Sequence, residues 1–178
     1  YNLSITVNGN TYTSSSTLRA PVPIDSLYFK GEVHDTLGYL WAHFNEPAGL
    51  GNQYRWYAKR IGKDNNFLSP MNSAFDDKFI DGKSFEFAYD RAVAPNSNSP
   101  DDNNEERGYF KEGDSVVVKF CHIGEPEFRY LRSYYMNLMS NGNPFAAPST
   151  LESNITGDAI GLWCAYGAFY KGVKVHKP

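Results

Sequence analysis

The sequence predicts a mainly β protein, an antiparallel β-sandwich of immunoglobulin or fibronectin type with one α-helix inserted near residues 126–140. Three observations predict this fold. Aromatic residues, which favour strands, make up 16% of the 178 residues. Short segments of alternating apolar and polar residues recur between clusters of Gly, Asn and Ser, which favour turns. Only one segment carries apolar residues at helical spacing.

Composition and charge exclude several classes of protein. The 41% of hydrophobic residues and 21% of charged residues exclude a wholly disordered chain. Seventeen basic and 20 acidic residues leave a net charge of −3, so nothing indicates nucleic-acid binding. No run of 18 apolar residues occurs, so no transmembrane helix is predicted.

The first 20 residues predict a hairpin. Leu3, Ile5 and Val7 alternate with polar residues, and Asn8-Gly9 is a strong signal for a tight turn. A two-stranded hairpin is only marginally stable alone. We therefore expect residues 1–20 to be the C-terminal hairpin of a preceding β-domain, and residues 21–178 to form the main sandwich domain.

The main domain is expected to consist of short strands. In residues 39–44, Leu40, Ala42 and Phe44 alternate with other residues, which predicts one buried and one outer face. Asp81-Gly82 predicts a two-residue hairpin between two of the strands. Residues 91–107 are polar and predict a long mobile loop that packs no core. The expected strands are 27–29, 39–44, 53–61, 75–80, 83–87, 115–123, 159–170 and 173–176.

The helix is predicted from an apolar stripe at spacings of three and four residues. Pro126 suits the first turn, and Asn141-Gly142 supplies a stop signal. The stripe consists of Phe128, Leu131, Tyr135, Leu138 and Met139.

No pattern in the sequence predicts catalytic residues, a metal site or a cofactor. The four histidines match no ligand spacing, and no serine lies in a G-x-S-x-G motif. The acidic loop 101–106 offers oxygen ligands for calcium but lacks the EF-hand spacing. A glycan hydrolase that uses two Asp or Glu carboxylates stays open as an alternative, because the sequence does not show which carboxylates lie together.

The two cysteines occur in apolar segments without C-x-x-C spacing. Cys121 and Cys164 are therefore expected to be buried, either as free thiols or as a disulfide if their segments are neighbours.

The excess of aromatic residues is the remaining functional signal. Tyr and Trp rings stack on sugars or peptides and anchor protein interfaces. Those that alternate with core residues are expected on an outer face. The predicted site for a ligand or partner consists of Tyr39, Trp41, Tyr54 and Tyr57, together with the loop 96–106.

Segments 21–27, 44–49, 52–56, 141–145 and 153–157 carry short motifs, among them Pro-Ile-Asp-Ser, Asn-Gly-Asn-Pro-Phe and Ser-Asn-Ile. These segments resemble a family of Bacteroidetes outer-membrane lipoproteins that is defined only as a domain of unknown function. In that family a "piDS" segment follows an N-terminal β-domain, and "NGNPF…SNI…G" follows the helix. Residues 162–164 depart from the glycine-rich strand with which the family usually continues.

The resemblance implies a secreted, lipid-anchored protein at the outer membrane, at the cell surface or on the periplasmic face, often encoded beside a TonB-dependent receptor. It offers no catalytic residues. The expected function is a non-enzymatic accessory lipoprotein of nutrient uptake that binds this receptor or its ligand, such as a glycan or peptide. The glycan hydrolase and a structural spacer domain are the alternatives.

Overall fold

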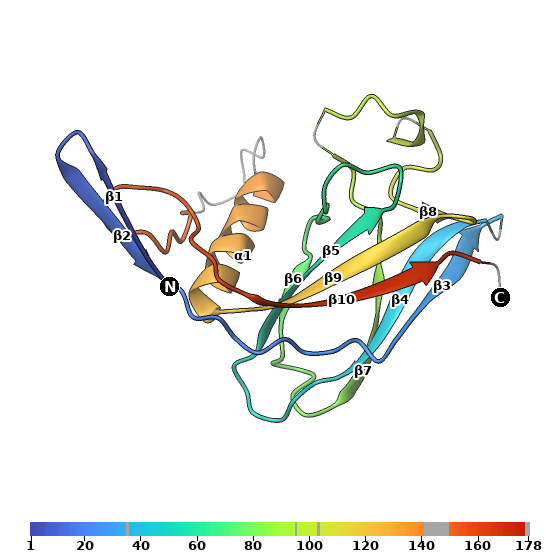
Figure 1. Cartoon of the computed structure of the whole chain (residues 1–178), viewed down its shortest axis with the longest axis horizontal. Helices are drawn as coiled ribbons and strands as arrows, with labels where there is room; N and C mark the ends of the chain where they lie inside the picture. Colours follow the sequence, from blue (N-terminus) through green and yellow to red (C-terminus); the bar gives the residue numbers. More distant parts are fainter. Residues whose placement is uncertain (35, 95, 103, 141–149, 177–178) are drawn as a thin grey trace.

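The computed structural model describes residues 1–34, 36–94, 96–102, 104–140 and 150–176. Two facing antiparallel sheets form its main part, which confirms the predicted fold class (Figure 1). The first sheet has the order β10-β9-β5-β6, from β5 (Gln53–Arg60), β6 (Ala74–Asp76), β9 (Ser115–Ile123) and β10 (Gly167–Lys174). The second has the order β3-β4-β7, from β3 (Ser26–Val33), β4 (Leu37–Asn45) and β7 (Ser84–Tyr89), with β8 (Phe110–Lys111) paired to β4.

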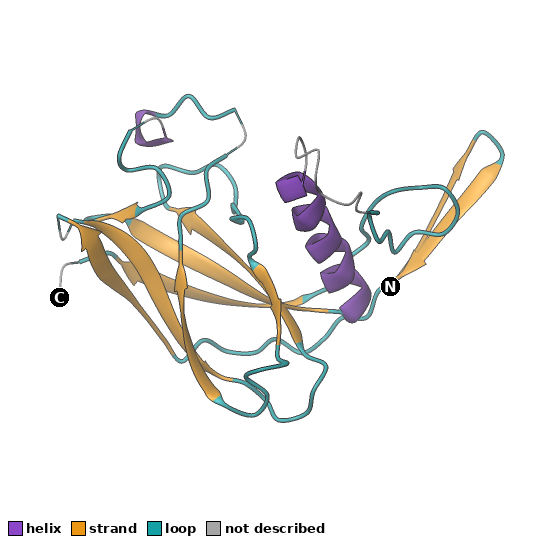
Figure 2. Ribbon diagram, turned by 180° about the vertical axis from the view of Figure 1, so that it is seen from behind, coloured by secondary structure: helices purple, strands orange, loops and turns teal. Residues whose placement is uncertain are grey.

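A hairpin and the helix lie together at one end of the sandwich. Strands β1 (Asn2–Val7) and β2 (Asn10–Ser15) form the predicted hairpin, whose turn has positive φ at Asn8 and Gly9. Helix α1 (Glu125–Ser140) lies between this hairpin and the sandwich in both views (Figures 1 and 2). The Thr13 amide donates to Thr156 Oγ1 over 2.8 Å, so the hairpin is attached to the main domain. That residues 1–20 complete a preceding domain stays a prediction.

The core between the sheets is built from the predicted alternation. Leu40, Ala42 and Phe44 of β4 are completely buried, as expected. The Phe44 ring lies 5.5 Å from the Tyr54 ring and 5.2 Å from the Phe120 ring, both in edge-on geometry. Such ring contacts add to the free energy gained by burial. The three rings come from both sheets and belong to one buried cluster, which is the centre of the sandwich.

The helix has the predicted extent and buries the predicted side. Phe128, Leu131 and Tyr135 pack on the outer side of the first sheet in a second cluster with Cys121. The apolar stripe is no longer buried at the C-terminal end of the helix, where Met139 is 68% exposed. The predicted stop at Asn141-Gly142 lies outside the described residues. Among the described helices, none is long and apolar enough to cross a membrane.

Both cysteines are free thiols in this second cluster. Burial raises the pKa of Cys121 to about 11 and that of Cys164 to about 12. Neither thiol is therefore ionised near neutral pH, which fits structural rather than nucleophilic cysteines.

The prediction of a β-hairpin at Asp81-Gly82 was wrong. The chain does turn there, with φ of 65° at Gly82, but β6 pairs with β5 and β7 pairs with β4. The turn therefore carries the chain from one sheet to the other. The Gly82 amide donates to Glu46 Oε2 over 2.7 Å, a bond between distant segments that overrides the local hairpin preference.

The closing strands are also shorter than predicted. Only Gly167–Lys174 is a strand, whereas residues 159–166 are not. Side chains that lie earlier in the chain bond to this backbone instead. Asn154 Oδ1 accepts from the Trp163 amide over 2.9 Å, and the Asn154 amide group donates to the Trp163 carbonyl over 2.7 Å. A side chain that satisfies the backbone in this way competes with a strand ladder.

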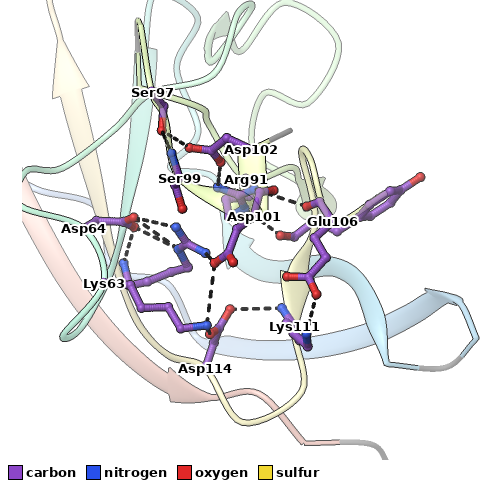
Figure 3. A network of polar contacts seen from close by, with 12 residues as sticks. Lys63, Asp64, Arg91, Ser97, Ser99, Asp101, Asp102, Glu106, Lys111 and Asp114 are labelled. Atoms are coloured by element: carbon purple, nitrogen blue, oxygen red, sulfur yellow. Dashed lines mark hydrogen bonds and ion pairs between the residues drawn. The ribbon is translucent and has the colours of Figure 1, made fainter. Parts of the chain in front are cut away.

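The acidic loop is anchored, contrary to the prediction that residues 91–107 pack no core. The side chain of Arg91 is 3% exposed and lies 2.6 Å from Asp102 Oδ1, within the 3₁₀ turn η1 (Pro100–Asp102). Arg60, at the end of β5, pairs with Asp101 and Asp64 at 2.8 Å each. Together we call these contacts the charge network, and Figure 3 labels its residues Arg91, Asp102, Asp101 and Asp64. Its acidic residues are neutralised by cations of the chain, so they are not a solvated run of charge.

Candidate functional site

The side of the β3–β4–β7 sheet that faces away from the core carries a row of aromatic and charged residues. Tyr28, Trp41 and Ala88 are neighbours in register across the three strands. Because side chains alternate along a strand, the surface on this side consists of Tyr28, Lys30, Tyr39, Trp41, His43, Glu86 and Ala88, which we call the outer face.

Trp41 lies at the centre of the outer face and is held by a cation. Lys30 Nζ lies 3.8 Å from the centroid of the Trp41 ring. The Tyr28 hydroxyl donates to Glu86 Oε1 over 2.5 Å, and Lys30 Nζ is 3.9 Å from Glu86 Oε2. Ala88 is the neighbour of Trp41 on the side opposite Tyr28, and the Trp41 ring is half-buried, with its Nε1 buried and without a partner among the described residues. The centre of the outer face is therefore an aromatic platform with one cation and one anion.

Tyr39 lies at one end of this face and His43 at the other. The rings of Tyr39 and Tyr109 are 5.2 Å apart, and the hydrogen bond to Tyr109 raises the pKa of Tyr39 to about 12. Tyr39 is therefore an uncharged hydrogen-bonding group at neutral pH. His43 Nε2 is 2.6 Å from Ser84 Oγ, and Nδ1 is 3.6 Å from Asp25.

The structure brings together only two of the four predicted site residues, Tyr39 and Trp41. Tyr57 lies on the far side of the other sheet, where it is half-buried between Lys119, at 4.0 Å, and Arg55, at 4.7 Å. Burial raises its pKa above the ordinary tyrosine value. Tyr57 therefore belongs with the residues beneath α1 and not with the outer face.

The prediction for Tyr54 was wrong. Tyr54 is completely buried and stacks on Phe120 with ring centroids 5.1 Å apart. Its hydroxyl donates to Glu46 Oε1 over 3.0 Å. The alternation in β5 is as expected, but its Tyr54 side is the core side, so this tyrosine cannot contact a partner.

Tyr28, Lys30, Glu86 and Ala88 were missed as parts of the site. The alternation of Tyr28 and Lys30 around buried Phe29 is a signal that could have placed these two residues on the outer face. Glu86 and Ala88 could not have been placed, because their position depends on β7 pairing with β4.

Three carboxylates lie together where β4 ends and β5 begins. Oxygens of Glu46, Asp77 and Asp81 lie within 4.8 Å of one another, and this is the set among the described residues that could hold a cation. Glu46 and Asp77 are 4% and 2% exposed. These three residues are also the candidates for the paired carboxylates of the hydrolase alternative.

These carboxylates fasten two loops to each other. Asp77 Oδ2 accepts from the amides of Gly51, over 2.9 Å, and Asn52, over 2.8 Å. Asp81 Oδ1 accepts from the Gly49 amide over 2.6 Å, and both Glu46 oxygens accept hydrogen bonds as well. The oxygens of the set accept hydrogen bonds from backbone amides and from the Asn52 and Tyr54 side chains, which is a structural use.

Replacing Asp77 with alanine is expected to lower the free energy of unfolding by about 2–3 kcal/mol, because the Gly51 and Asn52 amides lose a buried, charged acceptor. Urea denaturation measures this. Asp76→Asn is the matched control, since the neighbouring Asp76 is only half-buried; its effect is expected to stay within about 0.5 kcal/mol. Equal effects of the two substitutions would contradict the fastening role.

His122 is a buried titratable group next to this set. Its ring lies 5.2 Å from the Tyr54 ring, and Nδ1 is 2.8 Å from the Ala20 carbonyl, to which it donates. Nε2 is buried without a partner among the described residues. Burial lowers the pKa of His122, so the folded protein favours the neutral ring.

The free energy of unfolding is therefore expected to decrease as the pH is lowered through the range where His122 titrates. The unfolded chain binds a proton near pH 6.5, above the pKa of the folded state, so acidification through this range favours unfolding. We expect a lower free energy of unfolding at pH 5.5 than at pH 7.5, and a smaller difference in His122→Asn. Equal differences in both proteins would show that another group is responsible.

Hollows in the surface lie elsewhere. Two of about 480 Å³ flank α1, and one of about 230 Å³ lies beside Arg60. Neither Trp41 nor Glu46 lines any of these three. A partner of the outer face would therefore meet the surface of the sheet and not one of these three hollows.

Comparison with known proteins places the chain in a family. The model of a domain of unknown function, DUF4249, matches residues 1–168, so the chain belongs to this family. This confirms the part of the resemblance that concerns a family of unknown function. Neither the curated proteins nor the solved structures contain a significant match.

Proposed function

We propose that this member of the DUF4249 family is a non-enzymatic binding domain that contacts its partner through the outer face. The single observation that carries the proposal is the platform around Trp41 on the solvent side of a sheet. Trp and Tyr are enriched among the residues that dominate binding energy, and strands present them from a backbone that is already ordered. Lys30, Glu86 and Tyr39 supply charged and polar groups around the ring that can orient a partner.

The partner that we propose is a TonB-dependent receptor of the outer membrane or the nutrient that it takes up. The chain would then act as a lipid-anchored accessory protein of Bacteroidetes nutrient uptake. The resemblance of residues 21–27, 44–49 and 52–56 to such lipoproteins supports this step. A glycan or a peptide is a suitable nutrient, because both can stack on an aromatic ring.

A hydrolase that uses the Glu46 set is the second candidate, favoured by the proximity of three carboxylates. Glycoside cleavage needs one carboxylic acid and one carboxylate that face the substrate. Here the Glu46 and Asp77 oxygens accept hydrogen bonds from the protein itself, which favours the binding domain over the hydrolase. The structural spacer is the third candidate, and it would leave Trp41 without a partner.

Replacing Trp41 with alanine is expected to weaken binding of the partner about tenfold or more, while the protein stays folded. The lipid-anchored protein would be isolated from solubilised outer membranes, and the receptor that co-purifies would be quantified by mass spectrometry. Tyr57→Ala is the control, since it removes an aromatic ring from the opposite sheet. Equal recovery of the receptor with Trp41→Ala and with the unchanged protein would contradict the proposal.

A further inference from the structure

Strand β7 is an open edge of its sheet. It pairs with β4 on one side, and no strand among the described residues pairs with its other side. The Glu46 amide donates to the Lys83 carbonyl over 3.0 Å, in the register that continues through β7. Since the direction of backbone groups alternates along an antiparallel strand, Phe85 and Phe87 also bond to β4.

The backbone groups of the intervening residues therefore point outward. These are the N–H and C=O groups of Ser84, Glu86 and Ala88, for which the described residues provide no partner. Natural sheets usually protect such an edge with proline, lysine or a bulge. The segment Ser84–Tyr89 has none of these, and its pairing with β4 runs without a shift in register.

The side chains of β7 point alternately to the two sides of the sheet. Phe85 and Phe87 point toward the core and are only partly buried, so apolar surface continues to the open edge. Glu86 points to the outer face, where its side chain is 39% exposed and 3.9 Å from Lys30. The edge thus combines free hydrogen-bonding groups, an apolar side and a negative charge.

We propose that the β7 edge binds an extended segment of a partner protein, which adds a strand beside Ser84–Tyr89. The segment carries a basic residue opposite Glu86 and apolar residues on both sides of it, which pack beside Phe85 and Phe87. Direct cross-strand pairs of opposite charge are favourable, and strand addition is a common mode of peptide recognition. The inference shares Glu86 with the outer face, but it concerns backbone groups at the edge of the sheet and is tested without the contact proposed for Trp41.

A second copy of the chain is a poorer occupant of this edge. Two β7 strands paired antiparallel around Glu86 would place the two Glu86 side chains directly opposite each other. Like charges in that position destabilise a pair of strands. The charge of Glu86 therefore favours a basic partner strand over self-pairing.

The test uses two labelled peptides, one with lysine between two valines and a twin with glutamate in place of the lysine. Fluorescence anisotropy measures their binding to the unchanged protein, to Ala88→Pro and to Ala88→Thr. Proline removes an outward N–H without removing a bond to β4, and such an edge position tolerates proline. Threonine keeps the N–H and is the matched control. The Glu86→Lys variant tests the charge.

We expect the lysine peptide to bind the unchanged protein and Ala88→Thr equally, and Ala88→Pro at least tenfold more weakly. The glutamate twin should bind the unchanged protein at least tenfold more weakly, and Glu86→Lys should reverse this preference. Hydrogen exchange adds a readout that needs no variant. The amides of Ser84, Glu86 and Ala88 should exchange rapidly in the free protein and slowly once the lysine peptide is bound.

Four results would overturn the proposal: no binding of either peptide at millimolar concentration, equal binding of the two peptides, unchanged binding to a folded Ala88→Pro, or unchanged exchange of the three amides. Self-association that Ala88→Pro abolishes would also overturn it, because the edge would then join two copies of the chain. Analytical ultracentrifugation detects that outcome.

Discussion

Replacing Phe44 with alanine is expected to lower the free energy of unfolding by about 3–5 kcal/mol, because a completely buried ring leaves a cavity. The Phe44 ring contacts aromatic rings from both sheets, with Phe87 at 5.6 Å and Phe120 at 5.2 Å. Its removal therefore weakens the packing between the sheets. Chemical denaturation followed by circular dichroism measures the change.

The control for this substitution is Phe79→Ala. Phe79 is 79% exposed, so its removal is expected to change the free energy of unfolding by no more than about 0.5 kcal/mol. If the two substitutions had similar effects, Phe44 would not be at the centre of the core. Because domains are stable by only about 5–15 kcal/mol, the Phe44 variant is expected to be close to unfolding at 37 °C.

Replacing Arg91 with alanine is expected to destabilise the protein by about 3–5 kcal/mol, since it leaves the buried Asp102 carboxylate without its cation. Arg91 also donates through Nε to the Tyr109 carbonyl over 2.7 Å, and through an Nη to the Asp101 carbonyl over 2.9 Å. One side chain thus holds both ends of the acidic loop. Thermal and urea denaturation measure the loss.

Arg129→Ala provides the matched control for Arg91. The pair of Arg129 with Glu152 is exposed, with 61% and 45% of the two side chains accessible, so its loss is expected to cost less than about 1 kcal/mol. Limited proteolysis gives a second readout, because cleavage after Arg107 should accelerate only in the Arg91 variant. Comparable losses in the two variants would contradict the anchoring role of Arg91.

Local patterns predicted most of the elements but not how they are paired. The alternation around Leu40 and the stripe from Phe128 to Tyr135 are local signals, and the structure has a strand and a helix there. The Asp81-Gly82 turn is also local, but its two flanks pair in different sheets because Glu46 and Asp77 bind distant backbone amides. Contacts between segments far apart in sequence leave no local pattern.

The site was predicted in part for the same reason. Tyr39 and Trp41 follow from the alternation of one strand, and the structure places them on one face. Tyr54 lies in an equally good pattern, but alternation does not say which side of a strand is buried. The acidic loop was expected to pack against nothing because its composition is polar. The two cations that anchor it, Arg60 and Arg91, lie outside its acidic run and leave no pattern within it.

The most direct test of the central claim, that the outer face contacts the partner, is photo-crosslinking in living cells. A photoreactive amino acid would replace His43 on the outer face or, as the control, Met136, which is 55% exposed on α1. The account predicts a crosslink from position 43 to an outer-membrane receptor, and none from position 136. A crosslink from position 136 alone would contradict it.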